Sequence, residues 1–147
     1  MTAEVLHVLG DTAVVELSDD RHTVFSMTMA PRYAGPPMHV HDDCEEVFVC
    51  RDGEMVAVVG DERRTMKPGD MIVVSRGRPH TYFNPLDRPC LFACIIFNRH
   101  LLDLFRAIDA LTKQGTAAPD PAALVKALEE NHVGFAGPPV GPPVGPA

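Results

Sequence analysis

The chain has 147 residues, of which 46% are hydrophobic, and this length and composition suit one domain with a sizeable core. The formal net charge of −7 argues against a nucleic-acid-binding surface, as does the lack of any Lys/Arg cluster beyond Arg63 and Arg64. No run approaches the roughly 20 apolar residues that a membrane helix needs. The first residues lack a basic region followed by an apolar stretch, so no signal peptide is predicted. We therefore expect a cytoplasmic protein that binds neither nucleic acid nor membrane.

Short apolar runs separated by turn residues fill the first two thirds of the chain. Gly10-Asp11 and Asp52-Gly53 indicate tight turns, and the proline-rich segment 30–37 interrupts regular structure because proline cannot donate to a strand ladder. Many short strands with closely spaced turns are typical of an all-β sandwich or barrel. The expected strands cover residues 4–17 (two strands), 22–29, 39–41, 46–51, 54–59, 63–66, 71–74, 80–84 and 90–97.

The last third of the chain changes to helical spacing. After Asn98, which the pattern predicts as an N-cap, apolar residues recur every three or four positions, and Gly115 is the predicted stop. Asp120 followed by Pro121 predicts the N-cap and first position of a second helix, which should run to about Asn131. The sequence therefore predicts two helices after the strands.

These patterns divide the chain into three parts. We expect residues 1–98 to form the β domain, residues 99–134 its helical extension, and residues 135–147 a Pro/Gly-rich tail. The tail repeats too few residue types to pack a core, so it should be extended unless it docks against a neighbour. His100 and His132 fall in the helical part without a partner motif, and we interpret both as structural.

Two histidines and a glutamate follow the proline-rich segment. Side chains two apart on a strand share a face, so His39 and His41 can reach one point. Glu46 opens the next apolar run, which we interpret as the partner strand after a polar bend at residues 42–43. Two imidazoles and a carboxylate that converge across a hairpin make a site for a divalent transition metal, and His80 could supply a fourth ligand. The alternative is that these histidines are structural and the nearby acids are solvated turn residues.

Together with a second segment, this stretch resembles the paired motifs of the cupin superfamily, over residues 25–98. The spacer between Gly35 and His39 is three residues where the family has five, and Ser75 stands where the second motif has proline; neither position is a ligand. The matching positions are His39, His41, Glu46 and Gly53 in the first motif and Gly69, Gly77, His80 and Asn84 in the second.

The resemblance implies an all-β cupin jelly-roll barrel of antiparallel strands with two C-terminal helices. It also implies a metal centre of three histidines and one glutamate. Nitrogen and oxygen ligands suit Fe, Mn, Ni, Co, Cu or Zn, among which the sequence does not choose. The implied ligands are His39, His41, Glu46 and His80.

Strand alternation predicts which side chains line the barrel beside these ligands. If Glu46 points inward, Phe48 and Cys50 do so too, and Tyr82 and Asn84 follow His80 in the same way. Such a lining favours a small-molecule substrate that is mostly apolar, aromatic or phenolic. The alternative for Phe48 is ordinary core packing.

Three imidazoles and one carboxylate leave open positions on an octahedral metal, which distinguishes a catalytic site from a closed structural one. The chain looks like the small single-domain cupins related to quercetin dioxygenase. This likeness implies an oxygenase in which Glu46 is both ligand and proton acceptor. The hydroxyl of Tyr82 needs a partner when buried, so Tyr82 either orients the substrate or bonds a group that supports the ligands. The alternatives are a non-redox polyketide cyclase or isomerase, in which a nearby histidine or Tyr82 moves protons, and a small-molecule-binding module without catalysis. We expect a homodimer, because a barrel edge would otherwise be exposed.

Overall fold

The computed structural model describes residues 2–113 and 119–142. Neither helix in these ranges combines the length and the apolar character needed to cross a membrane. The elements are β1 (Val5–Val8), β2 (Asp11–Ser18), β3 (Thr23–Met29), β4 (Met38–His41), β5 (Glu46–Asp52), β6 (Met55–Val59), β7 (Glu62–Met66), β8 (Met71–Val74), β9 (His80–Phe83), β10 (Cys90–Ile96), α1 (His100–Thr112), α2 (Pro121–Glu130) and β11 (Val133–Gly137).

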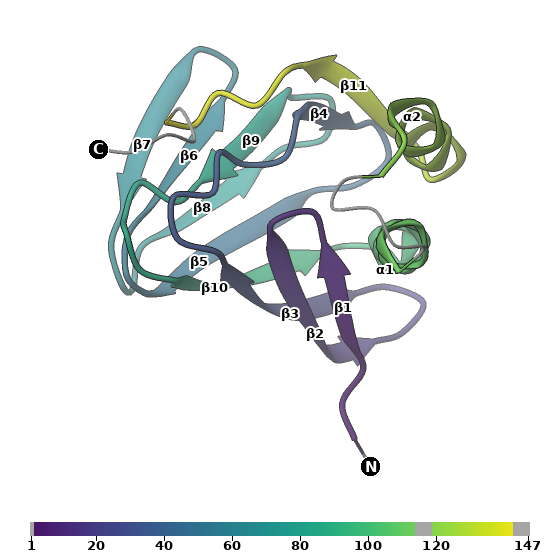
Figure 1. The fold of residues 1–147 in the computed structure, drawn as a ribbon, viewed down its shortest axis with the longest axis horizontal. Helices are drawn as coiled ribbons and strands as arrows, with labels where there is room; N and C mark the ends of the chain where they lie inside the picture. Colours follow the sequence, from purple (N-terminus) through teal and green to yellow (C-terminus); the bar gives the residue numbers. More distant parts are fainter. Residues whose placement is uncertain (1, 114–118, 143–147) are drawn as a thin grey trace.

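The strands form two antiparallel sheets that face each other (Figure 1). One sheet has six strands in the order β1-β2-β3-β10-β5-β8, and the other has five in the order β11-β4-β9-β6-β7. From β3 onward, consecutive strands lie in opposite sheets except for the hairpin of β6 and β7, and this crossing between facing sheets is the jelly-roll arrangement. The predicted all-β jelly roll with two helices is confirmed, except that the two sheets remain separate in the described residues and do not join into a closed barrel.

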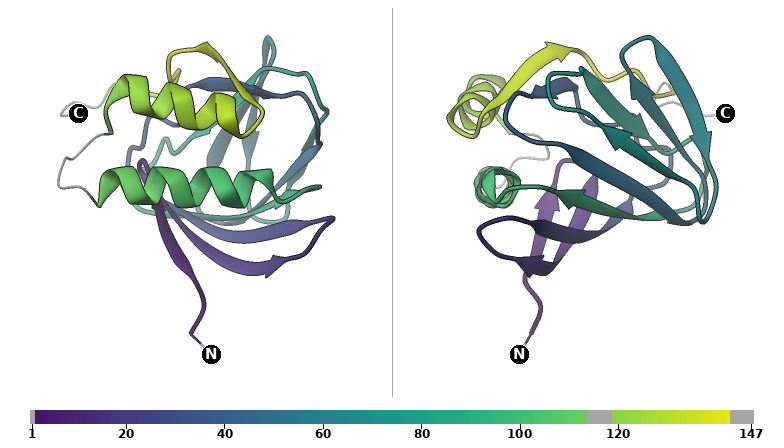
Figure 2. Two further views of the ribbon diagram at one scale, coloured as in Figure 1. Left: turned by 90° about the vertical axis from the view of Figure 1, so that its right-hand side faces the viewer. Right: turned by 180° about the vertical axis from the view of Figure 1, so that it is seen from behind.

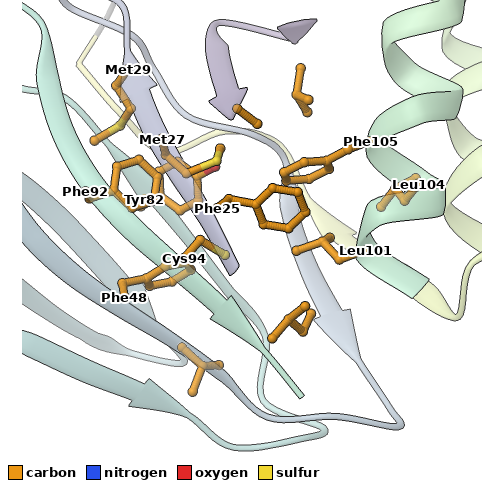
Figure 3. Packing of buried hydrophobic residues seen from close by; sticks show 14 of the residues in the cluster. Phe25, Met27, Met29, Phe48, Tyr82, Phe92, Cys94, Leu101, Leu104 and Phe105 are labelled. Atoms are coloured by element: carbon orange, nitrogen blue, oxygen red, sulfur yellow. The ribbon is translucent and has the colours of Figure 1, made fainter. Parts of the chain in front are cut away.

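The core lies between the sheets because the strands bury alternate residues. Along β3 every second side chain is buried, and β10 follows the same alternation. Figure 3 shows Phe48, Phe92 and Tyr82 close together between the sheets. Their rings meet edge to face, with centroids 5.9 Å apart for Phe48 and Phe92 and 5.0 Å apart for Tyr82 and Phe92. The period-2 pattern of the sequence therefore gives each strand one core-facing side.

The two helices lie side by side and cover one end of the sandwich (Figure 2). The apolar face of α1 supplies Leu101, Leu104 and Phe105 to the core, and all three are buried. The ring of Phe105 packs against that of Phe25 on β3, with centroids 4.8 Å apart (Figure 3). The helices thus close the space between the sheets at this end.

The helix starts agree only in part with the predictions. Asp120 is the N-cap of α2, as predicted, and its side chain accepts a hydrogen bond from the Ala123 N–H at 3.0 Å. For α1 the prediction of Asn98 as N-cap is wrong, because Arg99 occupies that position. The Asn98 side chain still accepts a hydrogen bond from the N–H of His100, the first residue of α1, at 3.0 Å. An N-cap side chain instead accepts from the second or third helical N–H. The predicted stop at Gly115 lies outside the described residues.

The C-terminal part of the described chain differs from the predicted tail. The strand β11 adds to the five-stranded sheet by pairing antiparallel with β4, where Val133 lies opposite His41. Further along, the Gly141 N–H donates to the Ala34 carbonyl oxygen at 3.0 Å. Residues 135–137, at the start of the predicted tail, therefore belong to the sheet. They pair there because β4 would otherwise have unpaired backbone groups at its edge.

Candidate metal centre

Three strands bring the four predicted ligands together. His39 and His41 lie on β4, His80 is the first residue of β9, and Glu46 is the first residue of β5. His39 and His80 are register partners on neighbouring strands, so their side chains point to the same face. The histidines belong to the five-stranded sheet and Glu46 to the six-stranded sheet opposite. The site is therefore assembled between the two sheets.

The ligand atoms are close enough to bind one ion. Glu46 Oε2 lies 2.9 Å from His80 Nε2 and 3.4 Å from His41 Nε2. The rings of His39 and His80 have centroids 4.4 Å apart. One ligand atom from each of the four residues lies within 4.8 Å of the others. His39 is half-buried and the other three are buried.

Backbone carbonyls orient two of the imidazoles. His39 Nδ1 lies 2.8 Å from the Pro37 carbonyl oxygen, and His80 Nδ1 lies 2.9 Å from that of Arg78. With Nδ1 as the donor in each bond, Nε2 carries the lone pair that a metal needs. Metal-binding histidines commonly use this arrangement to set the tautomer and the ring orientation.

The charges in the site also suit a cation. Burial, together with the neighbouring imidazoles, lowers the pKa of His39 to about 3, so this ring is neutral. Burial opposes the charge on Glu46, but the nearby imidazoles of His41 and His80 outweigh it and hold the carboxyl pKa well below its ordinary value. For His80, Glu46 likewise outweighs burial and raises the pKa. These opposite shifts show that the carboxylate favours a positive charge beside it, which is the charge that a bound metal ion would supply.

One atom in the site has no partner. His41 Nε2 is buried without a hydrogen bond, although it is aimed at the carboxylate of Glu46 from 3.4 Å. A buried polar nitrogen left this way calls for a ligand. Three imidazoles and one carboxylate are ligands of the kind that Fe, Mn, Co, Ni, Cu and Zn accept. The residues present fit a divalent transition metal, whose identity this donor set does not select.

The comparisons with known proteins agree with this geometry. The family model described as "Cupin domain" matches residues 25–96. The chain carries a cupin domain. The comparison with curated protein sequences finds no match. Similar solved structures, by contrast, are numerous.

Three of these structures illustrate the range of cupins with this fold. A sugar phosphate isomerase of the cupin superfamily from Silicibacter pomeroyi has 23% identity and a TM-score of 0.54, and the match spans 60% of each chain. KdgF from Halomonas has 18% identity and a TM-score of 0.60 over 65% of this chain and 86% of its own. The nucleoside dehydratase Pac13 from Streptomyces has 15% identity and a TM-score of 0.55 over 65% of this chain and 76% of its own. At these identities the likeness establishes the fold alone.

Cys94 of this cupin contacts the candidate centre and was not predicted to do so. Its Sγ donates to Glu46 Oε1 at 3.0 Å. Burial, together with the charge of Glu46, raises the pKa of the Cys94 thiol well above its ordinary value, so the sulfur keeps the proton that it donates. The alternation of β10 predicts that Cys94 is buried. Its contact with Glu46 cannot be predicted from neighbouring residues, because the two lie 48 positions apart in the sequence.

A cavity lies beside the ligands, between the sheets and the two helices. Its volume is about 50 Å³, enough for a few water molecules or part of a small substrate. His39 and Glu46 form part of its wall, so open positions on a bound metal would be reached from it. The other lining residues are mostly apolar: Val8, Leu9, Asp11, Tyr33, Pro36, Pro37, Tyr82, Cys94, Leu101, Leu104, Phe105, Ile108, Leu124 and Leu128.

Tyr82 lines this cavity, but its hydroxyl does not contact a predicted ligand in the described structure. It donates to Asp11 Oδ2 at 2.6 Å instead. Burial raises the pKa of Asp11 to about 8, even though the bond from Tyr82 acts in the opposite direction. Sequence analysis missed Asp11 because Gly10-Asp11 indicates a turn, whereas Asp11 is the first and buried residue of β2.

The other residues predicted to face inward are buried as expected. Phe48 packs edge to face on Tyr82, with ring centroids 5.2 Å apart, and Cys50 is 1% exposed. Asn84 is also buried, but its amide nitrogen donates to the carbonyl oxygens of Ala30 at 3.0 Å and Arg88 at 2.8 Å. Asn84 therefore holds two loops together and does not face a substrate.

A second group of potential ligands lies on the surface. His100 Nδ1 is 2.6 Å from Asp43 Oδ2, and its ring stacks on that of His132 with centroids 4.7 Å apart. The two histidines, predicted to have no partner motif, thus come together with an acid from the loop between β4 and β5. Asp43 and His132 are exposed, and the hydrogen bond to His100 already satisfies the carboxylate. His100 therefore offers a surface position at which a histidine can be removed without touching the buried centre.

Proposed function

We propose that this cupin is a metal-dependent oxygenase of the dioxygenase type that acts on a small apolar, aromatic or phenolic molecule. The observation that carries the proposal is that two of the four candidate ligands, His39 and Glu46, also form part of the wall of a largely apolar cavity. A transition metal held there would supply a positive charge and open positions for oxygen and substrate.

The residues of the chain would do the rest of the work. Leu101, Leu104 and Phe105 cover the cavity and exclude water from it. Glu46 carries a negative charge and would accept a proton from the substrate as well as hold the metal. The Tyr82 hydroxyl and the Asp11 carboxyl group, joined by a hydrogen bond, would supply two groups at the cavity wall that can donate protons.

A non-redox reaction is the second candidate. The neighbours of this fold include an isomerase and a dehydratase, and both reactions depend on moving protons. The protonated Asp11 beside Tyr82 suits such chemistry, because a neutral carboxylic acid can act as a general acid at neutral pH. A cupin that binds a small molecule without catalysis is the third.

Metal analysis followed by oxygen consumption tests these candidates. The wild-type protein should hold about one equivalent of Fe, Mn, Ni, Co or Cu, and Glu46→Ala should lose it. His100→Ala is the matched control, because it removes a surface histidine and should leave the equivalent in place. Oxygen uptake with a panel of small phenols, such as catechol and its methyl derivatives, should be present in wild type and absent in Glu46→Ala.

The other outcomes separate the alternatives. One equivalent of zinc, with no oxygen uptake but proton exchange at a substrate carbon, would favour the non-redox reaction. If the bound metal persisted in Glu46→Ala and was lost in His100→Ala, the assignment of the metal to the buried centre would be contradicted. If the protein bound no metal under any loading condition, the proposed metal-dependent mechanism would be refuted.

A further inference from the structure

Among the described residues, two buried side-chain polar atoms besides His41 Nε2 lack partners, and both belong to residues of the cavity wall. These atoms are Asp11 Oδ1 and the hydroxyl of Tyr33. Asp11 is only 3% exposed, so water outside the protein does not reach its carboxyl group. Buried polar atoms are rarely left unpaired, and an unpaired one beside a cavity indicates a partner that enters that cavity.

The two side chains are held in place before any ligand arrives. Asp11 Oδ2 accepts the Tyr82 hydroxyl at 2.6 Å, which fixes the orientation of the carboxyl group. The Tyr33 carbonyl oxygen accepts the Asn84 N–H at 3.0 Å, and the Tyr33 ring lies directly over Gly10, where a Cβ would come within 2.2 Å of it. Such preorganisation lowers the cost of ligand binding.

Both free atoms can act as donors. The bond from Tyr82 occupies Asp11 Oδ2, and burial raises the carboxyl pKa to about 8, so at neutral pH the proton resides on Oδ1. Burial keeps the Tyr33 hydroxyl protonated as well, by raising its pKa. Tyr33, Tyr82 and Cys94 lie close enough for Asp11 to affect their pKa values, and burial raises all three, so these groups are neutral at this pH. His39 and the charged Glu46 line the same cavity.

We propose that Asp11 and Tyr33 form a donor pair that binds a carbonyl oxygen of a small, uncharged and otherwise apolar substrate. The cavity supplies the apolar contacts through Leu101, Leu104 and Phe105, and no Lys or Arg is among the lining residues to pair with an anion. The inference rests on the proposed function for the assumption that the cavity is the substrate site. It adds a second point of attachment for that substrate, besides the metal.

Two probes of nearly equal shape test the donor pair without turnover. Acetophenone and α-methylstyrene differ only in a carbonyl oxygen in place of a methylene group. Titrations followed by NMR should show that the wild-type protein binds acetophenone roughly tenfold more tightly, the preference expected of a net hydrogen bond. Tyr33→Phe and Asp11→Leu should reduce this preference severalfold, whereas Asp11→Asn, which keeps a donor, should retain it.

The variants also separate a binding role from a structural one. The Tyr33 hydroxyl has no partner in the described structure, so Tyr33→Phe should not lower the melting temperature. If Asp11→Leu fails to fold, Tyr33→Phe still decides the question. An undiminished preference in Tyr33→Phe, or equal affinities for the two probes in wild type, would overturn the inference. Metal content and oxygen uptake are measured independently, so their absence beside an intact preference would count against the proposed function alone.

Discussion

His39 on β4 and His80 on β9 lie directly opposite each other in neighbouring strands, with ring centroids 4.4 Å apart. Cross-strand pairing thus places these two ligands on one face, and the two-residue period of β4 adds His41. Glu46 reaches the same point from the opposite sheet. A metal ion bound here would link the two sheets, and this arrangement couples metal binding to stability.

Removal of the metal should lower the melting temperature. With free metal about 100-fold above its Kd, the loss should be roughly 5–10 °C by calorimetry after chelation. His39→Ala should show no such difference between metal-loaded and chelated protein. The surface variant His100→Ala should keep it. An equal shift in His39→Ala would show that the ion binds elsewhere.

Cys94→Ala should weaken metal binding without unfolding the protein. The variant removes the donor to Glu46 Oε1, and loss of such a supporting bond commonly costs about tenfold in affinity. Cys94→Ser should restore much of the affinity, because a hydroxyl can donate in the same place. Cys90→Ala, on the same strand and equally buried, is the control. Competition with a chelating dye measures all four proteins, and unchanged affinity in Cys94→Ala would contradict the role.

Asp11 should make stability fall as pH rises. Its pKa is about 8 in the folded protein against an ordinary value of 3.8, so between these values the folded state holds a proton that the unfolded state has lost. The free energy of unfolding should then decline by about 1.4 kcal/mol per pH unit from this group, and level off above pH 8. Asp11→Asn lacks the proton and should not show this decline. Urea unfolding from pH 5 to pH 8 gives the difference between the two proteins, and parallel curves would refute the shift.

Gly35→Ala should be far more disruptive than Gly69→Ala. Both glycines have positive φ, +94° and +96°, so each substitution carries backbone strain. At Gly35 a Cβ would also lie 1.9 Å from the carbonyl oxygen of Tyr82, whereas nothing lies within 4 Å at Gly69. We expect losses of about 1 kcal/mol for Gly69→Ala and more than about 3 kcal/mol for Gly35→Ala. Equal losses in urea unfolding would show that the clash relaxes.

The cluster of four candidate ligands could be predicted from the sequence because the rules that place them are local. His39 and His41 share a face by strand geometry, and Glu46 and His80 fall at offsets that the cupin resemblance specifies. The same applies to the strands, whose alternation and turn residues are visible in short windows.

The rest of the site depends on contacts between distant segments. Tyr82 meets Asp11 across 71 positions, and Cys94 meets Glu46 across 48. The sequence around Asp11 looks like that of an ordinary acidic turn residue, and the sequence around Cys94 looks like that of an ordinary buried cysteine. Their roles become visible only when the sheets face each other, and so does the cavity between them.

The strand β11 gives the end of the described chain a protective role. Without it, the backbone of β4 would form an open sheet edge beside the histidines, and such an edge recruits strands from other molecules. A chain shortened to end at Asn131 would keep all four ligands and still be exposed to aggregation at the strand that carries two of them.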